Sequence, residues 1–260
     1  MAVQISKFDD VSVITLLPGR KLVIACDSLG AIGPKELDQV KVSGYTVGRF
    51  ACRVPLMEVI AVGARPLLVV NTLCVEPTPT GEEILSGIRD EIEAAGLDPR
   101  ISITGSMEKN VPVSQTGLGV TVIGLANGDA SGKGEGLRWG LGAPGDTVVV
   151  VGMPKVGSEV RLGDNEIADI PTLLRVADYP SAGDILPVGS SGILSEARKM
   201  ARRSGLLFVP NPGSEIDLEK SAGPSTCLLV SLPSGKWADF CEHLAPTGRP
   251  CFEVGRLVAK

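Results

Sequence analysis

The sequence contains very little histidine. His243 is the single histidine among 260 residues, and aromatic residues make up only 3% of the chain. One histidine excludes a zinc site with several histidine ligands from the same chain, and a Ser-His-Asp triad would have to use His243. Hydrophobic residues at 43% and charged residues at 21% are typical of a globular chain and not of a disordered one.

A surplus of positive charge is absent as well. The formal net charge is −5 and the pI is about 5.1, whereas a nucleic-acid-binding protein presents a basic surface to the phosphates. No apolar stretch reaches the length of a membrane-spanning helix. The acidic pair Asp9-Asp10 lies where a secretory signal would need apolar residues. We therefore expect a cytoplasmic protein that binds neither nucleic acid nor membranes.

The cysteines lack the spacing of a zinc or redox motif. No two of them are related as C-x-x-C. The six are Cys26, Cys52, Cys74, Cys227, Cys241 and Cys251. Most stand among apolar residues, which favours buried free thiols in a reducing compartment.

The hydrophobic pattern predicts two α+β domains. In the first half we expect strands at residues 11–16, 21–26, 67–75, 101–103 and 117–125, and helices at 43–64 and 80–95. Pro55 must kink the first of these helices or divide it in two. Thr80 and Glu83 have the spacing of a capping box at the start of the second helix.

The second half repeats this mixed character. Strands are expected at residues 146–152, 226–232 and 251–258, and helices at 166–176, 191–203 and 235–244. Between the halves, residues 126–145 are rich in glycine, lack the Walker pattern and precede no helix. We interpret them as an inter-domain connection or a long hairpin.

With so little histidine, carboxylates that hold a hard metal ion are a plausible catalytic apparatus, because Mg²⁺ prefers oxygen ligands and binds phosphate oxygens. Acidic residues at element ends or in turns are Asp9, Asp10, Asp27 and Glu108, and Glu58 lies in the helix that contains Pro55. Each also has a structural interpretation. Asp27 would satisfy a turn after its strand, and Glu58 would be a solvent-exposed helix residue.

Short motifs occur at residues 9–13, 25–28, 58–66 and 114–126. Together they resemble the aminoimidazole ribonucleotide (AIR) synthase superfamily, which includes thiamine-monophosphate kinase. EVIAVGARP at residues 58–66 is similar to the family motif D-I-x-x-x-G-A-x-P. DDVSV at 9–13 resembles the D-D-A-A-V start of the kinase branch, and ACDS at 25–28 resembles T-T-D-T/S. SQTGLGVTVIGLA at 114–126 resembles the strand after the family's G-G-D/E-T turn, and looser matches continue to residue 257.

The resemblance implies a two-domain PurM-like α+β fold. Residues 1–130 would form an N-terminal domain that binds ATP and metal. This domain would pair with its copy in a homodimer, forming a barrel of strands between the subunits. Residues 131–260 would form the C-terminal α+β domain.

The resemblance also implies which residues bind ATP and Mg²⁺. The implied metal ligands are Asp9, Asp10, Asp27 and Glu58, and the implied nucleotide contacts are Asp27, Ser28, Gly105 and Ser106. The family's G-G-D-T is Thr104-Gly105-Ser106-Met107 here, so Ser106 replaces a carboxylate, and Glu108 is a possible substitute two residues on. Asp10 and Glu108 are candidates for the base. Lys109 would contact phosphate, unless it is a solvated turn lysine.

Within the superfamily the chain most resembles the α-ribazole kinase branch. We therefore expect an ATP- and Mg²⁺-dependent kinase that phosphorylates the 5′-hydroxyl of a riboside such as α-ribazole, in cobamide salvage. Two alternatives stay open. One is a thiamine-monophosphate kinase-like enzyme, and the other is a catalytically inactive, nucleotide-binding regulatory homodimer.

Overall fold

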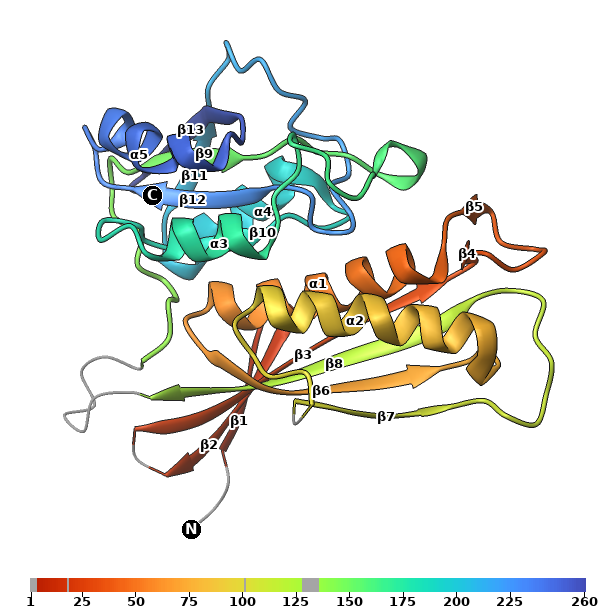
Figure 1. The fold of residues 1–260 in the computed structure, drawn as a ribbon. Coiled ribbons are helices and arrows are strands. Elements are labelled where there is room, and N and C mark those ends of the chain that lie inside the picture. The colour runs from red at the N-terminus through yellow and green to blue at the C-terminus, as the bar shows by residue number, and fades with distance from the viewer. Residues whose placement is uncertain (1–3, 18, 101, 128–135) are drawn as a thin grey trace. The chain divides into compact units, whose positions relative to one another are not determined.

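The computed structural model describes residues 4–17, 19–100, 102–127 and 136–260. The chain divides into two compact units (Figure 1). One comprises Met1–Ile60 with Ala64–Leu137, and the other comprises Ala61–Gly63 with Arg138–Lys260. No helix within the described ranges has both the length and the apolar character needed to cross a membrane.

The first unit is built on a six-stranded sheet of order β1-β2-β3-β8-β6-β7. The strands are β1 (Gln4–Phe8), β2 (Val11–Leu17), β3 (Arg20–Gly30), β6 (Arg65–Leu73), β7 (Ile103–Met107) and β8 (Gly117–Asn127). Neighbours are antiparallel except β6 and β7, which are parallel. A parallel pair needs a crossover connection, and helix α2 (Glu82–Ala94) supplies it. A second, two-stranded sheet pairs β4 (Ile32–Gly33) with β5 (Val40–Lys41).

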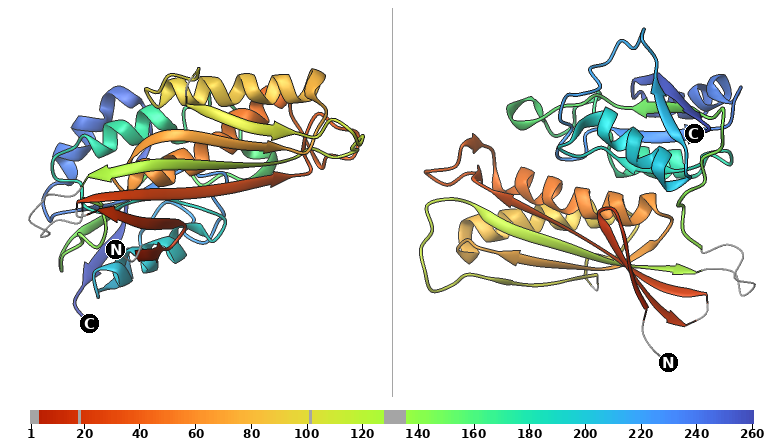
Figure 2. Two further views of the ribbon diagram at one scale, coloured as in Figure 1. Left: turned by 90° about the horizontal axis from the view of Figure 1, so that it is seen from below. Right: turned by 180° about the vertical axis from the view of Figure 1, so that it is seen from behind.

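Two helices, α1 (Gly44–Ala61) and α2 (Glu82–Ala94), cover one face of the six-stranded sheet, as both Figures 1 and 2 show. A short π-helical turn, η1 (Pro77–Gly81), leads into α2. Along β8, alternate residues are buried beneath the helices, including Val120 and Val122. The helices approach closely at Gly48, which has no side chain; a Cβ there would collide with the Ile84 carbonyl oxygen.

A buried ion cluster joins α1 to α2. Glu91 accepts hydrogen bonds from Arg49 Nε at 2.6 Å and from Arg53 Nε at 2.7 Å. The side chains of Glu91 and Arg53 are only 1% and 4% exposed. Charges this deeply buried require partners, and here each has one.

The second unit contains a five-stranded antiparallel sheet of order β10-β12-β9-β13-β11. Its strands are β9 (Thr147–Val151), β10 (Ile185–Pro187), β11 (Leu207–Pro210), β12 (Leu228–Leu232) and β13 (Cys251–Val258). The helices are α3 (Ile170–Ala177), α4 (Gly192–Arg203) and α5 (Trp237–Leu244), with short turns η2 (Gly157–Glu159) and η3 (Ala245–Thr247). Asp169 caps α3 by accepting a hydrogen bond from Thr172 N at 2.9 Å.

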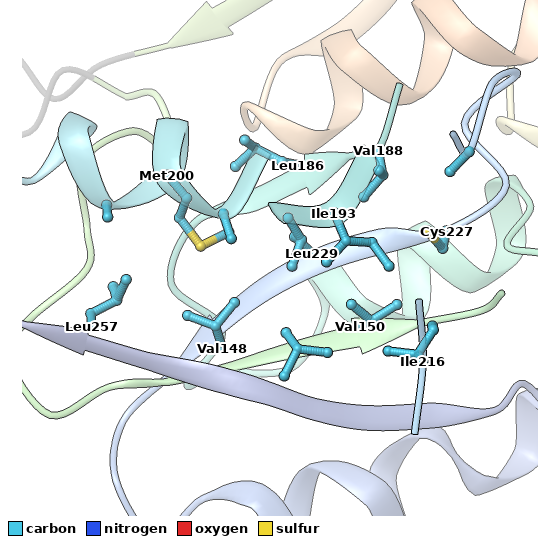
Figure 3. Close-up of a cluster of buried hydrophobic side chains, with 14 of the residues drawn as sticks. Val148, Val150, Leu186, Val188, Ile193, Met200, Ile216, Cys227, Leu229 and Leu257 are labelled. Carbon is cyan, nitrogen blue, oxygen red and sulfur yellow. The ribbon is translucent and has the colours of Figure 1, made fainter. Parts of the chain in front are cut away.

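The core of this unit includes a cluster that joins the central strands to α4 (Figure 3). Val148 and Val150 of β9 contribute alternate side chains to it, and Ile193 and Met200 come from α4. All four are fully buried. Removing this apolar surface from water is the main stabilising contribution of the helix–sheet packing.

The structure corrects several local predictions. The capping box is wrong, because Thr80 Oγ1 donates to Glu76 Oε1 at 2.6 Å, and Glu83 Oε2 accepts from Gly44 N at 3.0 Å. Pro55 lies inside α1, which is a single continuous helix. The expected turn at residues 104–106 is part of strand β7, and the prediction missed the short strands β1, β10 and β11. Much of the predicted connection at 126–145 lies outside the described residues.

Candidate functional site

The strand register brings distant predicted residues into two neighbouring rows of one sheet. In the first row, Asp27 of β3 pairs with Val120 of β8, Val120 pairs with Asn71 of β6, and Asn71 pairs with Gly105 of β7. Val120 and Asn71 are buried on the side that the helices cover. Asp27 is therefore on the helix-covered face, because residues in register on adjacent strands share a face.

The second row lies one residue further along and faces the opposite side. It runs from Ser28 through Gly119 and Thr72 to Ser106. The side chains of Ser28, Thr72 and Ser106 are exposed. The sheet thus aligns Asp27 with Gly105 and Ser28 with Ser106, although each pair is 78 residues apart in the sequence.

The width of the sheet limits what these rows share. β3 and β7 are separated by three inter-strand spacings, or about 14 Å. Mg²⁺ holds its ligands at about 2.1 Å. Asp27 and Ser106 therefore do not bind the same ion within one chain.

The sequence predicted that Asp27 follows the end of its strand. In the structure Asp27 lies inside β3. Burial raises the pKa of its carboxyl, and a hydrogen bond from the Ser28 backbone opposes this in part. Val11 pairs with Ala25, which places the turn containing Asp9 and Asp10 next to this part of β3. Asp9 has a φ of 48°, a left-handed conformation that aspartate tolerates in turns.

Asp9, Asp10 and Asp27 together form an acidic corner of the sheet. Their oxygen donors fit a hard metal ion by type, and a cation would offset the cost of desolvating Asp27. Within the described part of the chain, however, no three His, Cys, Asp or Glu side chains are grouped closely enough to hold a metal ion. The assignment of Asp9, Asp10 and Asp27 as ligands therefore stays a prediction.

Glu58 lies away from this corner. It is half-buried near the end of α1, and its neighbour Val59 packs where a side chain at Gly124 would be. Gly124 pairs with Val23, four residues before Asp27 on β3, a separation of about 13 Å along the strand. The structure does not bring Glu58 to Asp27, and the metal-ligand role of Glu58 stays a prediction.

At the other end of the rows, a pocket of about 340 Å³ lies between α2 and the edge strand β7. Helix α2 contributes Leu85 and Arg89, and β6 contributes Asn71. Residues 103–107 and Lys109 complete the lining. Three predicted site residues, Gly105, Ser106 and Lys109, are therefore brought together here.

Gly105 is required by a close approach between strands and not by a turn. A side chain at this position would collide with the backbone oxygen and the Oδ1 atom of Asn71. Asn71 Nδ2 donates a hydrogen bond to Thr104 O at 3.0 Å, which holds the amide against β7. The glycine therefore opens space over Asn71 at the base of the pocket.

Glu108 stabilises the turn that follows β7. Its Oε1 accepts hydrogen bonds from Asn110 N at 2.7 Å and Val111 N at 3.2 Å. These bonds lower the pKa of the Glu108 carboxyl. A lowered pKa makes Glu108 a weaker general base than an ordinary glutamate.

Sequence reasoning missed Arg89 and Asn71 as site residues. A signal existed for each of them. Arg89 stands four residues after Leu85, on the same side of α2, and Asn71 directly follows the apolar run at residues 67–70. Neither signal specifies a pocket without the β6–β7 pairing.

Residues 8–126 match the family model described as AIR synthase related protein, N-terminal domain. These residues therefore form an AIR synthase-related N-terminal domain. The match covers the sheet from β2 to β8 and both helices of the first unit. A search of curated proteins gives no match.

The chain shares its mixed α+β PurM-like fold with solved structures of low sequence identity. Thiamine-monophosphate kinase from Stenotrophomonas maltophilia K279a is 16% identical with a TM-score of 0.66, over 99% of this chain and 89% of that one. Hydrogenase maturation protein HypE in complex with ATP is 16% identical with a TM-score of 0.66, over 92% and 77%. A structure of AaThiL complexed with AMPPCP and TMP is 18% identical with a TM-score of 0.63, over 97% and 85%.

Proposed function

We propose that this protein is an ATP- and Mg²⁺-dependent small-molecule kinase that phosphorylates the 5′-hydroxyl of a riboside such as α-ribazole. The proposal depends on one observation, the alignment of two rows of residues across the sheet of an AIR synthase-related domain. The acidic corner lies at one end of these rows, and the pocket with the cationic side chains Arg89 and Lys109 lies at the other. The similarity to a ThiL structure complexed with AMPPCP and TMP supports a nucleotide and a small acceptor as ligands.

In this proposal the acidic corner holds the metal. Asp27, Asp9 and Asp10 supply oxygen ligands, and Glu58 belongs to the same set by its motif. Bound Mg²⁺ would offset the negative charge on the phosphates. Phosphoryl transfer requires little covalent chemistry from the protein, so positioning and charge are its main contributions.

The remaining residues position the phosphates and accept the proton. Ser28 and Ser106 offer hydroxyl donors, and Gly105 permits a close approach to the backbone. Lys109 supplies a point charge. Asp10, in an exposed turn, is the better candidate to accept the proton of the attacking hydroxyl, because the pKa of Glu108 is lowered by its turn.

We also propose that the chain forms a homodimer through the sheet face opposite the helices of the first unit. Two rows on this face carry apolar side chains, because Leu22 pairs with Ile14 and Leu125, and Ile24 pairs with Ile123. All five are partly accessible within the unit. A second copy would cover them and complete the predicted barrel of strands, while removing apolar surface from water.

The substitution Asp27→Asn tests the kinase proposal. It keeps the shape of the side chain and removes its charge, so we expect Mg²⁺-dependent ADP release to be abolished while circular dichroism and thermal unfolding stay unchanged. Asp178→Asn is the matched control, because Asp178 is exposed at the end of α3. Wild-type turnover by the Asp27 variant would overturn the metal assignment.

Two alternative functions predict different results in the same assay. A thiamine-monophosphate kinase-like enzyme would phosphorylate thiamine monophosphate in preference to ribosides. The regulatory homodimer is favoured by one observation, the serine at position 106 where the family motif has a carboxylate. It would bind nucleotide and release no ADP with any acceptor.

A further inference from the structure

The second unit contains a carboxylate that is completely removed from solvent. Asp184 stands directly before β10 and is 0% exposed. Its Oδ2 atom accepts a hydrogen bond from Leu141 N at 3.1 Å. Its Oδ1 atom is also buried, and it accepts no hydrogen bond from any residue that the structure describes. Because an unpartnered buried carboxylate oxygen costs free energy, Asp184 Oδ1 is a candidate ligand-binding atom.

An arginine of opposite charge lies near Asp184. Arg138 donates from Nη1 to Ala182 O at 2.6 Å and to Gly183 O at 3.0 Å, and Gly183 immediately precedes Asp184. Its Nη2 atom donates to Ala177 O, at the end of α3, at 3.1 Å. Burial lowers the pKa of Arg138, and the negative charge of Asp184 opposes this effect.

These two opposite charges attract each other without direct contact. Within the described ranges of the chain, no ion pair joins Arg138 to Asp184. The Nε atom of Arg138 is buried and, in the same ranges, has no hydrogen-bond partner. A donor and an acceptor are thus both left over in one region, as expected where a small molecule bridges a polar contact.

The turn after α4 supplies a third unpartnered group. Ser204 Oγ is buried and forms no hydrogen bond with the residues that the structure describes. A Cβ atom at Gly142 would lie 3.2 Å from this oxygen. Gly142 follows Leu141, whose N–H group bonds to Asp184. Three unpartnered polar groups therefore border one short segment, residues 138–142.

The charges of these groups select a small neutral ligand. The ligand must donate to Asp184 Oδ1 and accept from Arg138 Nε. The charge of Asp184 disfavours an anion, and the charges of Arg138 and the nearby Arg203 disfavour a cation. Water both donates and accepts, and a buried water typically makes about three hydrogen bonds.

We propose that one internal water molecule is a permanent ligand of the second unit, donating to Asp184 Oδ1 and accepting from Arg138 Nε. Ser204 Oγ is its third partner. The water connects the arginine that bonds the end of α3 to the carboxylate that precedes β10. This inference is independent of the proposed kinase function, because all three residues belong to the second unit and the candidate site belongs to the first.

A crystal structure of the full chain, at a resolution that shows ordered water, tests the proposal directly. We expect one density peak at about 2.7–3.2 Å from both Asp184 Oδ1 and Arg138 Nε. A direct ion pair between the two side chains, the absence of a peak, or a peak with the short contacts of a metal ion would overturn the proposal.

Magnetic relaxation dispersion of the water oxygen counts long-lived internal waters in solution. Asp184→Leu should lower this count by one molecule and raise the equilibrium constant for unfolding about 10- to 100-fold, because Arg138 Nε and Leu141 N lose their partners. Asp184→Asn keeps a hydrogen-bonding side chain of the same shape and should keep the water. If Asp184→Leu fails to fold, loss of the water from Asp184→Asn would still contradict the proposal.

Asp146→Leu is the matched control. Asp146 is another buried carboxylate that accepts from a backbone amide, Ala143 N at 2.8 Å. In the described structure it has no buried oxygen without a partner. Asp146→Leu should therefore leave the number of long-lived waters unchanged. An unchanged count in Asp184→Leu, or the same loss in both leucine variants, would overturn the proposal.

Discussion

Replacing Glu91 tests how the first unit holds α2, the helix that carries Arg89, in place. In Glu91→Ala the guanidinium groups of Arg49 and Arg53 lose the carboxylate that they share, and Arg53 is 4% exposed. Removing one partner of a buried ion pair costs about 3–5 kcal/mol. For a protein of this size that corresponds to a drop in Tm of about 6–20 °C.

Urea unfolding monitored by circular dichroism would measure the change in free energy of unfolding. Glu93→Ala is the control, because Glu93 is exposed on the same helix, and it should change stability by about 0.5 kcal/mol or less. Pairing Glu91→Met with Arg53→Met should restore part of the loss, since no buried charge at position 53 then lacks a partner. A loss below about 1 kcal/mol in Glu91→Ala would refute the reasoning, because the cluster would then contribute no more than a surface ion pair.

Two further predictions concern acid stability and assembly. Although burial alone would raise the pKa of Glu76, hydrogen bonds from Lys35 and Thr80 lower it from 4.5 to about 2. The stabilisation from the ionised carboxylate is complete above about pH 4.5 and is lost as the pH falls towards 2. The free energy of unfolding of Glu76→Gln should therefore depend less on pH in that window, and an unchanged dependence would contradict this prediction. Light scattering should give the mass of two chains for the wild type and of one chain for a folded Ile24→Lys variant, whereas a monomeric wild type would refute the dimer.

The sequence predicted the long, strongly patterned elements well. Helix α4 and strand β9 were expected close to their observed bounds, because each has a clear apolar pattern. The short strands β1, β10 and β11 were missed, since 3–5 residues carry too little periodicity. The capping box failed because Glu83 bonds to Gly44, a contact between distant segments that spacing alone does not reveal.

The candidate site was predictable in part. Motifs pointed to Asp27 and Gly105 individually, but only the register of β3, β8, β6 and β7 places them in one row. Gly105 looked like a turn residue, because glycine is common in turns. Glycine is needed at position 105 because Asn71, a residue distant in sequence, lies too close for a side chain there. Arg89 was missed because an arginine on the exposed face of an amphipathic helix usually contacts only solvent.

The most direct test of the kinase proposal is a phosphorylation assay with mass detection. The wild-type protein would be incubated with ATP, Mg²⁺ and a panel of ribosides that includes α-ribazole, alongside thiamine monophosphate and a sample without Mg²⁺. The proposal predicts that a riboside gains one phosphoryl group, with ADP released in equal amount and only when Mg²⁺ is present. Nucleotide binding with no phosphorylated product from any acceptor would contradict it.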